Sequence, residues 1–162
     1  MKKIVITGGL GYIGTELCKI YSGEARFKKI VVTDNRFMSE RVKQLRDWGI
    51  EFVHGSILDK ELMKSILSDA DVVHHLAGVT DVAYVKTEAN SEQDKKIIDT
   101  ALIGTNNVLK YTPNHCKIVF PSTHVVYEGF NETKHGILEN EPVCPVLTYS
   151  SSKATNEIDI KN

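Results

Sequence analysis

The chain has 162 residues, and its 20 lysine and arginine side chains nearly balance its 21 aspartate and glutamate side chains, for a formal net charge of −1 at pH 7. This length fits a single domain, and the near-neutral charge gives no reason to expect a nucleic acid or a membrane surface as partner. The three cysteines are scattered without a Cys-x-x-Cys pair, so the sequence predicts neither a disulfide framework nor a zinc site and favours a reducing, cytoplasmic setting. No apolar run approaches the length of a membrane span, and the first residues lack the pattern of a secretory leader.

The first predicted elements are an apolar strand at 2–7, a glycine-rich turn and a helix at 15–21. Gly8, Gly11 and Gly14 punctuate the turn. A strand that passes through such a turn into a helix presents open backbone N–H groups and the positive end of the helix dipole to a pyrophosphate. One glycine makes the turn, one lets the backbone approach the ligand, and one lets helix and strand pack closely. The opening of the chain therefore predicts a dinucleotide site.

The second predicted strand, at 28–33, ends at Asp34, which lies 20 residues beyond Gly14. A carboxylate at this strand end accepts hydrogen bonds from both ribose hydroxyls of NAD and repels the 2′-phosphate of NADP. Asp34 and Asn35 are also residues that commonly open a plain turn, but the preceding glycines favour the ribose role. Arg36 could hold a 2′-phosphate, so NAD is the favoured cofactor and NADP the alternative.

The rest of the chain continues the alternation of strands and helices. The further predicted strands are at 50–54, 71–76 and 117–120, and the further predicted helices at 59–69 and 92–111. Nearly continuous apolar strands separated by helices indicate a parallel sheet that is covered on both faces. The sequence therefore predicts an α/β fold with a doubly wound parallel sheet, and a ligand crevice outside the carboxyl ends of its strands. The stretch 128–148 is the one long irregular segment.

Two histidines, His74 and His75, end the fourth predicted strand beside this crevice. A metal site would need a third ligand and a carboxylate partner, and the sequence places neither. We therefore interpret both histidines as packing or backbone-capping residues, and no metal site is predicted.

Tyr149 and Lys153 carry the chemistry that the end of the chain suggests. If this segment is helical, residues four apart share one face. An ammonium beside a tyrosine favours the phenolate and lowers the pKa of the phenol toward the range of a general base. Alone, the pair would be read as two solvated helix residues. After a dinucleotide turn and five alternating strands, it predicts a catalytic pair.

Several segments together resemble the extended short-chain dehydrogenase/reductase family, the NAD-dependent nucleotide-sugar epimerases and dehydratases. They are the glycine turn at 7–14, Val32–Asn35, Val73–Gly78, the Gly-Thr-x-Asn of Gly104–Asn107, Phe120–Tyr127, and Glu157 after the lysine. The resemblance covers essentially the whole chain. It implies a Rossmann fold, NAD as cofactor, a nucleotide sugar as substrate and a homodimer as a further partner.

The same resemblance assigns roles to individual residues. It implies that Tyr149 takes the proton from a sugar hydroxyl, that Thr123 hydrogen-bonds the reacting oxygen, and that Lys153 holds the ribose and stabilises the phenolate. Tyr149 and Lys153 count among the cofactor-binding residues too. The others are Gly8, Gly11, Tyr12, Ile13, Gly14, Asp34, Asn35, Ser56, Ile57, Leu76, Ala77 and Gly78.

The chain also departs from the family pattern. Ser56 stands where an aspartate is common, Ala101 replaces an asparagine, and Thr80 stands where UDP-galactose 4-epimerases resemble one another in having a lysine. His124 and Val125 follow Thr123, where dehydratases tend to carry an Asp-Glu pair for water elimination. These departures disfavour 4,6-dehydration and leave the galactose epimerase reaction open.

The sequence thus favours an NAD-dependent epimerase that acts on a nucleotide sugar. Two alternatives stay open: an NAD(P)-dependent reductase or dehydrogenase of a non-nucleotide substrate, and a non-catalytic dinucleotide-binding module. Residues 1–162 are expected to form one NAD-binding domain. Because the chain stops just past Lys153, whereas the family continues into a substrate-binding portion of comparable length, this domain is expected to be the N-terminal part of that longer architecture. The sequence leaves two alternatives open: a fragment of a longer protein, or a naturally truncated member of the family.

Overall fold

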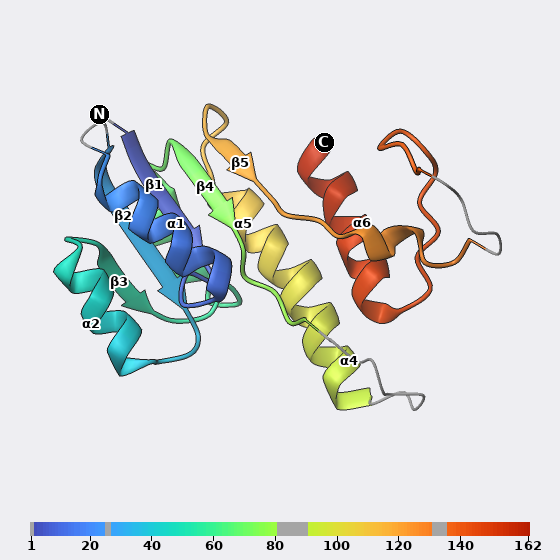
Figure 1. Ribbon diagram of the computed structural model, residues 1–162, viewed down its shortest axis with the longest axis horizontal. Helices are drawn as coiled ribbons and strands as arrows, with labels where there is room; N and C mark the ends of the chain where they lie inside the picture. Colours follow the sequence, from blue (N-terminus) through green and yellow to red (C-terminus); the bar gives the residue numbers. More distant parts are fainter. Residues whose placement is uncertain (1, 25–26, 81–90, 131–135) are drawn as a thin grey trace.

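The computed structural model describes residues 2–24, 27–80, 91–130 and 136–162. At its centre is a five-stranded parallel sheet (Figure 1). Its spatial order is β3-β2-β1-β4-β5. The strands are β1 (Lys2–Thr7), β2 (Phe27–Asp34), β3 (Glu51–His54), β4 (Val72–His75) and β5 (Lys117–Val119). Each pair of neighbouring strands runs parallel. The order steps outward from β1 in both directions, so the predicted doubly wound Rossmann topology is confirmed.

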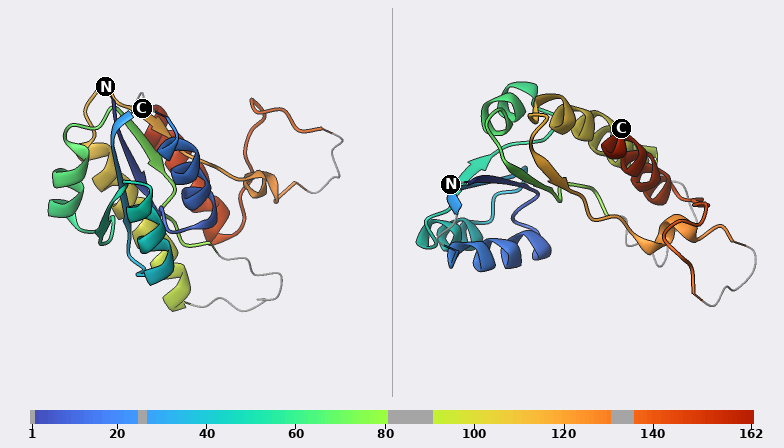
Figure 2. Two further views of the ribbon diagram at one scale, coloured as in Figure 1. Left: turned by 60° about the vertical axis from the view of Figure 1, so that its left-hand side comes forward. Right: turned by 90° about the horizontal axis from the view of Figure 1, so that it is seen from above.

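Helices cover both faces of this sheet (Figure 2). Those described are α1 (Tyr12–Ser22), α2 (Ser39–Asp47), α3 (Lys60–Leu67), α4 (Ser91–Ile98), the π-helical segment η1 (Asp99–Gly104), α5 (Thr105–Tyr111), the 3₁₀ turn η2 (His124–Tyr127) and α6 (Thr148–Lys161). Helices α1 and α2 lie on one face, while α3 and α5 lie on the other. None of the helices in the described part of the chain has the length and apolar character needed to cross a membrane.

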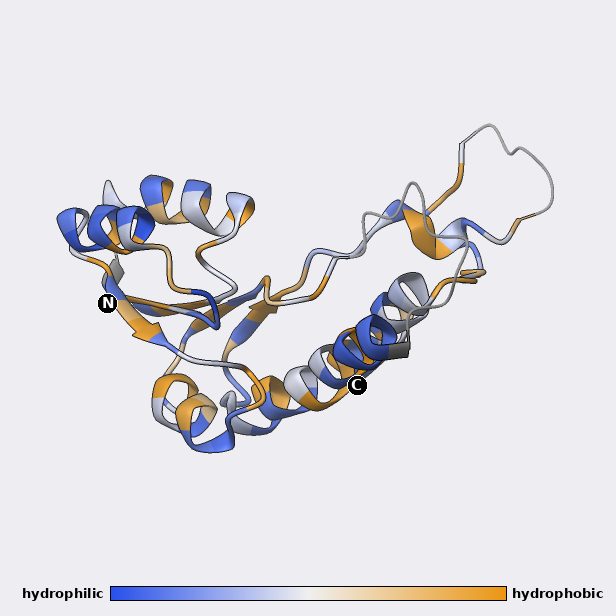
Figure 3. Ribbon diagram, turned by 90° about the horizontal axis from the view of Figure 1, so that it is seen from below, coloured by the Kyte–Doolittle hydropathy of each residue, from blue (hydrophilic) through white to orange (hydrophobic). Residues whose placement is uncertain are grey.

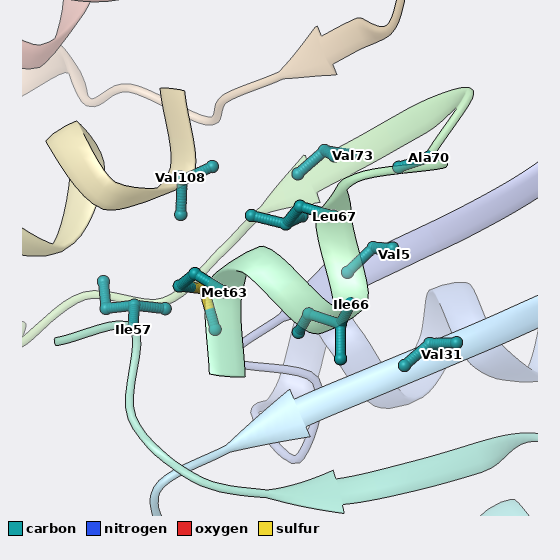
Figure 4. Packing of buried hydrophobic residues seen from close by; sticks show 9 residues of the cluster. All are labelled: Val5, Val31, Ile57, Met63, Ile66, Leu67, Ala70, Val73 and Val108. Atoms are coloured by element: carbon teal, nitrogen blue, oxygen red, sulfur yellow. The ribbon is translucent and has the colours of Figure 1, made fainter. Parts of the chain in front are cut away.

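Alternating strand residues feed two separate cores. Ile4, Ile6 and Val32 pack with α1 and α2, whereas Val5 and Val31 point to the opposite face and pack with α3 and α5 (Figure 4). This division follows from the two-residue period of a strand. Because both faces are buried, β1 carries no polar face and reads as a continuous apolar run.

Helix α2 is the element that the sequence prediction missed. Its nine residues, Ser39–Asp47, are mostly charged or polar, and two of them, Val42 and Leu45, are buried. Two apolar positions three apart are too few to reveal a helical period. Met38 precedes the helix without a side-chain hydrogen bond to its first turn, so the usual capping signal was missing as well.

The long helix predicted at 92–111 exists, but a π-helical turn, η1, interrupts it between α4 and α5. Gly104 ends η1 at a close approach to the loop after β3: a Cβ at this position would collide with the Ile57 side chain. Such π turns are rare and frequently lie at functional sites. Here the turn brings the helix against the loop that borders the crevice.

The segment after β5 leads away from the sheet to η2 and returns to α6, which packs beside α4 and η1 (Figures 1 and 3). The segment includes the irregular stretch that the sequence predicted at 128–148, of which residues 131–135 lie outside the described residues. Glu128 anchors the return: its carboxylate accepts hydrogen bonds from the backbone N–H groups of Val146 at 3.0 Å and Leu147 at 2.8 Å, and from the Ser150 hydroxyl. A carboxylate at a helix N-terminus also interacts favourably with the helix dipole.

Candidate functional site

A cleft of about 880 Å³ opens at the carboxyl ends of the strands, where a doubly wound sheet is expected to bind its ligand. Its lining includes every residue that was predicted for the cofactor: Gly8, Gly11, Tyr12, Ile13, Gly14, Asp34, Asn35, Ser56, Ile57, Leu76, Ala77 and Gly78, with Tyr149 and Lys153. The structure therefore brings together residues that are spread over nearly 150 positions of the sequence.

The glycine turn is packed so tightly that side chains have no room in it. Gly8 has a φ of +69°, in the left-handed region, and a Cβ there would lie 2.7 Å from the Ala77 backbone nitrogen. A Cβ at Gly14 would lie 2.5 Å from the Gly9 Cα. Helix α1 begins just after Gly11, with no side-chain cap. The first N–H groups of the helix lack intrahelical partners and lie at the cleft, where an anion can bind them.

Asp34 ends β2 with its side chain almost completely buried, and both of its carboxylate oxygens already accept hydrogen bonds. One oxygen accepts from the Leu10 backbone N–H at 3.0 Å and from the Arg36 guanidinium at 3.2 Å. The other accepts from the Arg36 backbone N–H at 3.0 Å and from its Nε at 3.1 Å. The hydrogen bond and charge of Asp34 raise the pKa of Arg36. The Arg36 side chain, which also lines the cleft, is therefore engaged by the Asp34 carboxylate.

The loop after β3, which also lines the cleft, is held by the Gly-Thr-x-Asn segment where η1 passes into α5. Asn107 is buried, and its Nδ2 donates to the backbone carbonyl oxygens of Ile57 at 3.0 Å and Leu58 at 3.3 Å. Ser56 in the same loop accepts at its hydroxyl from the Leu58 N–H at 3.2 Å. Through these hydrogen bonds the motif holds the loop after β3 in position at the cleft. Its role could have been inferred from the amide, since a buried asparagine needs hydrogen-bond partners.

The two histidines of β4 pack as predicted. His75 is fully buried, and its Nδ1 and Nε2 lie 2.8 Å from the Thr7 hydroxyl and 3.0 Å from the Thr105 hydroxyl. Burial, together with the positive charge of Lys153, lowers the pKa of His75 to about 4. His74 Nε2 lies 2.7 Å from the Tyr21 hydroxyl. No group of three potential ligands in the described segments is arranged to hold a metal ion.

Tyr149 and Lys153 occupy the first half of α6 and border the cleft from the side opposite Asp34. The Lys153 Nζ donates to the Pro121 carbonyl oxygen at 3.1 Å. It lies 4.4 Å from the centre of the Phe120 ring and 5.9 Å from that of the Tyr149 ring. Burial lowers the pKa of this ammonium. The pair therefore shares a helix face as predicted.

One expectation about this pair is wrong for the chain as described. Lys153 was expected to lower the pKa of Tyr149, whereas burial raises it. The reason is geometric: the ammonium donates to Pro121 and lies over Phe120, nearer to that ring than to the phenol ring. A bound cation near the phenol would act against this desolvation.

Thr123 is the one predicted catalytic residue that is not part of the cleft lining. Its backbone is extended, and its hydroxyl accepts from the Val125 N–H at 3.4 Å, at the start of η2. Its neighbours Pro121 and Ser122 do reach the cleft. The Ser122 hydroxyl donates to the Glu157 carboxylate, which links the strand end to α6.

The cleft also contains polar residues that the sequence prediction did not include. Lys96, Asp99 and Thr100 reach it from α4 and η1. Arg36, which the sequence suggested as a partner of a 2′-phosphate, lines it just after β2. The helical residues were missed because they belong to no motif. Asp99 and Thr100 lie in the π turn η1, and such turns frequently lie at functional sites.

Comparison with known proteins gives the family of this molecule. The model of the NAD dependent epimerase/dehydratase family matches residues 4–162. The chain belongs to this family. The resemblance to extended short-chain dehydrogenases/reductases that the sequence motifs suggested is thereby confirmed.

Individual relatives of the family are moderately similar. The dTDP-D-glucose 4,6-dehydratase of Dictyostelium discoideum is 29% identical over 97% of this chain and 39% of its own length. The UDP-glucose 4-epimerase of Halalkalibacterium halodurans is 31% identical over 95% of this chain and 44% of its own length. The crystal structure of the dTDP-glucose 4,6-dehydratase of Bacillus anthracis str. Ames in complex with NAD superposes with a TM-score of 0.77 at 28% identity, over 98% of this chain and 49% of that chain. The chain thus spans less than half the length of these relatives.

The cleft of this family member fits a dinucleotide. Gly8 and Gly14 leave the backbone bare where side chains would collide, and the start of α1 offers uncapped N–H groups for a pyrophosphate. Asp34 places a carboxylate in the cleft at the end of β2. Lys153 and Tyr149 would meet the other end of such a ligand.

Proposed function

We propose that residues 1–162 form the NAD-binding domain of an enzyme that epimerises a nucleotide sugar. One observation carries the proposal: Tyr149 and Lys153 border the same cleft as the glycine turn and Asp34. A dinucleotide that lies along this cleft, with one ribose at Asp34, extends toward the phenol and the ammonium. Binding and proton-transfer groups then act on one ligand.

The roles of the residues follow from their positions. NAD, when bound, would accept a hydride from the sugar and return it. The N–H groups at the start of α1 hold the pyrophosphate, and Asp34 accepts from a ribose. Lys153 donates to the second ribose, and the phenolate of Tyr149 accepts the proton of a sugar hydroxyl. Thr123 would need to turn from the Val125 N–H to donate to the reacting oxygen.

Epimerisation is favoured over water elimination by the residues that follow Thr123. His124 is exposed and Val125 has no ionisable group, so the pair lacks the two carboxyl groups that would serve as acid and base for elimination. Relatives with both reactions are known: one above is a 4,6-dehydratase and another a 4-epimerase. The side chains of η2 therefore support the epimerase among them.

The first test is calorimetric titration of this chain with NAD⁺ and, separately, with NADP⁺. We expect saturable binding with a preference for NAD⁺. In Asp34→Asn the carboxylate loses its charge, so we expect NAD⁺ affinity to fall about tenfold and the preference over NADP⁺ to shrink. Asp47→Asn, at the exposed end of α2, is the matched control and should bind as the parent chain does. Failure of both nucleotides to bind would refute the proposal.

The second test addresses the reaction. NAD⁺ and UDP-glucose are added to the chain, reduced cofactor is followed at its near-ultraviolet absorbance, and the sugar products are separated by chromatography. An epimerase yields the 4-epimer with no net reduced cofactor, and Tyr149→Phe abolishes the product while Tyr127→Phe does not. Net accumulation of reduced cofactor would instead favour the dehydrogenase alternative.

A homodimer is the remaining part of the proposal. Ile98, Leu102 and Ile103 are between 40% and 48% exposed along α4 and η1, and adjoining apolar side chains of this kind are typical of an interface. Sedimentation equilibrium tests it: a dimer is expected, and replacing Leu102 and Ile103 by glutamine should shift the mass to that of a monomer.

A further inference from the structure

A second, small cavity lies behind the proposed catalytic pair. Its volume is about 10 Å³, close to the smallest space that holds one ordered water. Tyr149 and Lys153 line both this cavity and the cofactor cleft. The small side chain of Ala101 in η1 leaves the space open on the far side. Whatever occupies the cavity therefore touches the rear of the site.

A residue that lines the same cavity carries a buried polar atom without a partner. Asn156, also on α6, lines the space and is 3% exposed. Its Oδ1 is the one fully buried side-chain oxygen or nitrogen that has no hydrogen-bond partner within the described residues. Leaving such an atom unsatisfied costs about 1–3 kcal/mol, and native structures satisfy most buried polar groups with protein or water. The oxygen thus marks a place for a hydrogen-bond donor.

Lys153 lies three residues before Asn156, and residues three apart on a helix are neighbours on one face. An ammonium has three N–H donors, and one of them binds the Pro121 carbonyl oxygen. A water in the cavity can accept from a second N–H of Lys153 and donate to Asn156 Oδ1. The Ser152 hydroxyl, which also lines the cavity, donates to the Tyr149 carbonyl oxygen and keeps lone pairs for the second hydrogen of the water.

We propose that Asn156 is a positioning residue for Lys153: it holds one ordered water in this cavity, and the water orients the ammonium between the Tyr149 phenol and the cofactor cleft. The inference rests on the proposed function in assigning Lys153 its role, but the water itself does not depend on it. Without the water, Lys153 would lose a hydrogen-bond partner on its cavity side, where the Phe120 ring and apolar side chains also lie.

The test compares the parent chain with Asn156→Leu, which is similar in size and lacks the acceptor. Thr155→Val, an equally isosteric change on the exposed side of the same helix, is the matched control. A high-resolution crystal structure of the parent chain should show a water within hydrogen-bond distance of Asn156 Oδ1 and Lys153 Nζ, and Asn156→Leu should lack it. NAD⁺ affinity should fall about five- to tenfold in Asn156→Leu and stay unchanged in Thr155→Val.

The pKa of Lys153, measured by nuclear magnetic resonance after ¹³C-methylation of lysines, gives a readout that a merely structural role would not move. The groups that share its surroundings are Tyr149 on α6, His75 on β4, and Lys96 and Asp99 across the cleft. With these unchanged, loss of the water should lower the pKa of Lys153 by about one unit. Asn156→Asp keeps an acceptor and should retain the water.

The outcomes separate this inference from the proposed function. A parent chain without a water at Asn156 Oδ1 overturns the inference, whether or not NAD⁺ binds. An unchanged Lys153 pKa in a folded Asn156→Leu chain overturns it as well. If Asn156→Leu does not fold, the parent crystal structure and Asn156→Asp decide. If NAD⁺ fails to bind while the water and the pKa shift are present, the proposed function fails and the positioning of Lys153 stands.

Discussion

His75 makes the stability of this fold depend on pH in a way that can be calculated. In the unfolded chain a histidine titrates near pH 6.5, whereas in the folded chain the pKa of His75 is about 4. The unfolded state therefore binds the proton more readily, so the stabilising contribution is complete above pH 6.5. It is lost progressively as pH falls from 6.5 to 4, and it changes no further below that. A difference of about 2.5 pKa units corresponds to about 3 kcal/mol, a large part of the stability of a typical domain.

Urea unfolding at several values between pH 7.5 and 4.5, followed by the fluorescence of Trp48, measures this loss. Other groups with lowered pKa values, among them Asp69 and Glu128, also destabilise the fold in acid. The informative quantity is therefore the difference between the parent chain and His75→Gln, which cannot titrate at this position. We expect the parent chain to lose about 2.5 kcal/mol more than His75→Gln over this range, which stops short of the folded pKa. Equal losses in the two chains, or a directly measured His75 pKa near 6.5, would show that the reasoning is wrong.

Three other substitutions test the geometry of the cleft. In Gly8→Ala the new Cβ meets backbone at 2.7 Å, so we expect at least a tenfold loss of NAD⁺ affinity in calorimetry and a loss of stability above about 2 kcal/mol. Gly49→Ala, with a similar φ of +70° but open space around it, is the control and should cost about 1 kcal/mol with binding unchanged. Asn107→Leu leaves two backbone carbonyl groups without their donor, which should lower the free energy of unfolding in urea by about 2 kcal/mol. An unchanged urea midpoint would show that Asn107 does not hold this loop in position. Glu128→Gln removes the charge that caps α6, so we expect thermal unfolding to report a loss of about 1 kcal/mol near neutral pH. Burial alone would raise the pKa of Glu128, but its hydrogen bonds lower it below the ordinary value. The cap should therefore weaken as pH falls through that lowered pKa, and a pH-independent difference between the two chains would contradict this.

The sequence predicted the parts of the fold that leave periodic or glycine signals. The strands are almost continuous apolar runs because the sheet is covered on both faces, so their positions were found to within a residue or two. The glycine turn and Asp34 were found because the backbone geometry there admits few alternatives. Helix α2 was missed because it buries two side chains in the core, and two apolar positions are too few to show a helical period.

The parts of the site that were not predicted depend on tertiary geometry. The π turn places Asp99 and Thr100 at the cleft, and no local pattern distinguishes it from a regular helix. The raised pKa of Tyr149 likewise follows from where the Lys153 ammonium lies and from burial, not from the four-residue spacing that the sequence shows. The spacing sets which residues are neighbours, while the protonation behaviour is set by what surrounds them.

Besides its packing against α4 and η1, helix α6 is tied by hydrogen bonds to the segment after β5. The Pro121 carbonyl oxygen accepts a hydrogen bond from the Lys153 ammonium, and the Ser122 hydroxyl donates to the Glu157 carboxylate. The Glu128 carboxylate accepts from the backbone N–H groups at the start of the helix. Contacts of this kind link the segment and the helix into one cooperative unit, which can open without breaking the sheet. In native-state hydrogen exchange, the amides of α6 would then exchange with a shared opening free energy below that of β1 and β4. The proton-transfer residues and the glycine turn would belong to different folding units that meet across the cleft, so that ligand binding itself is what joins them.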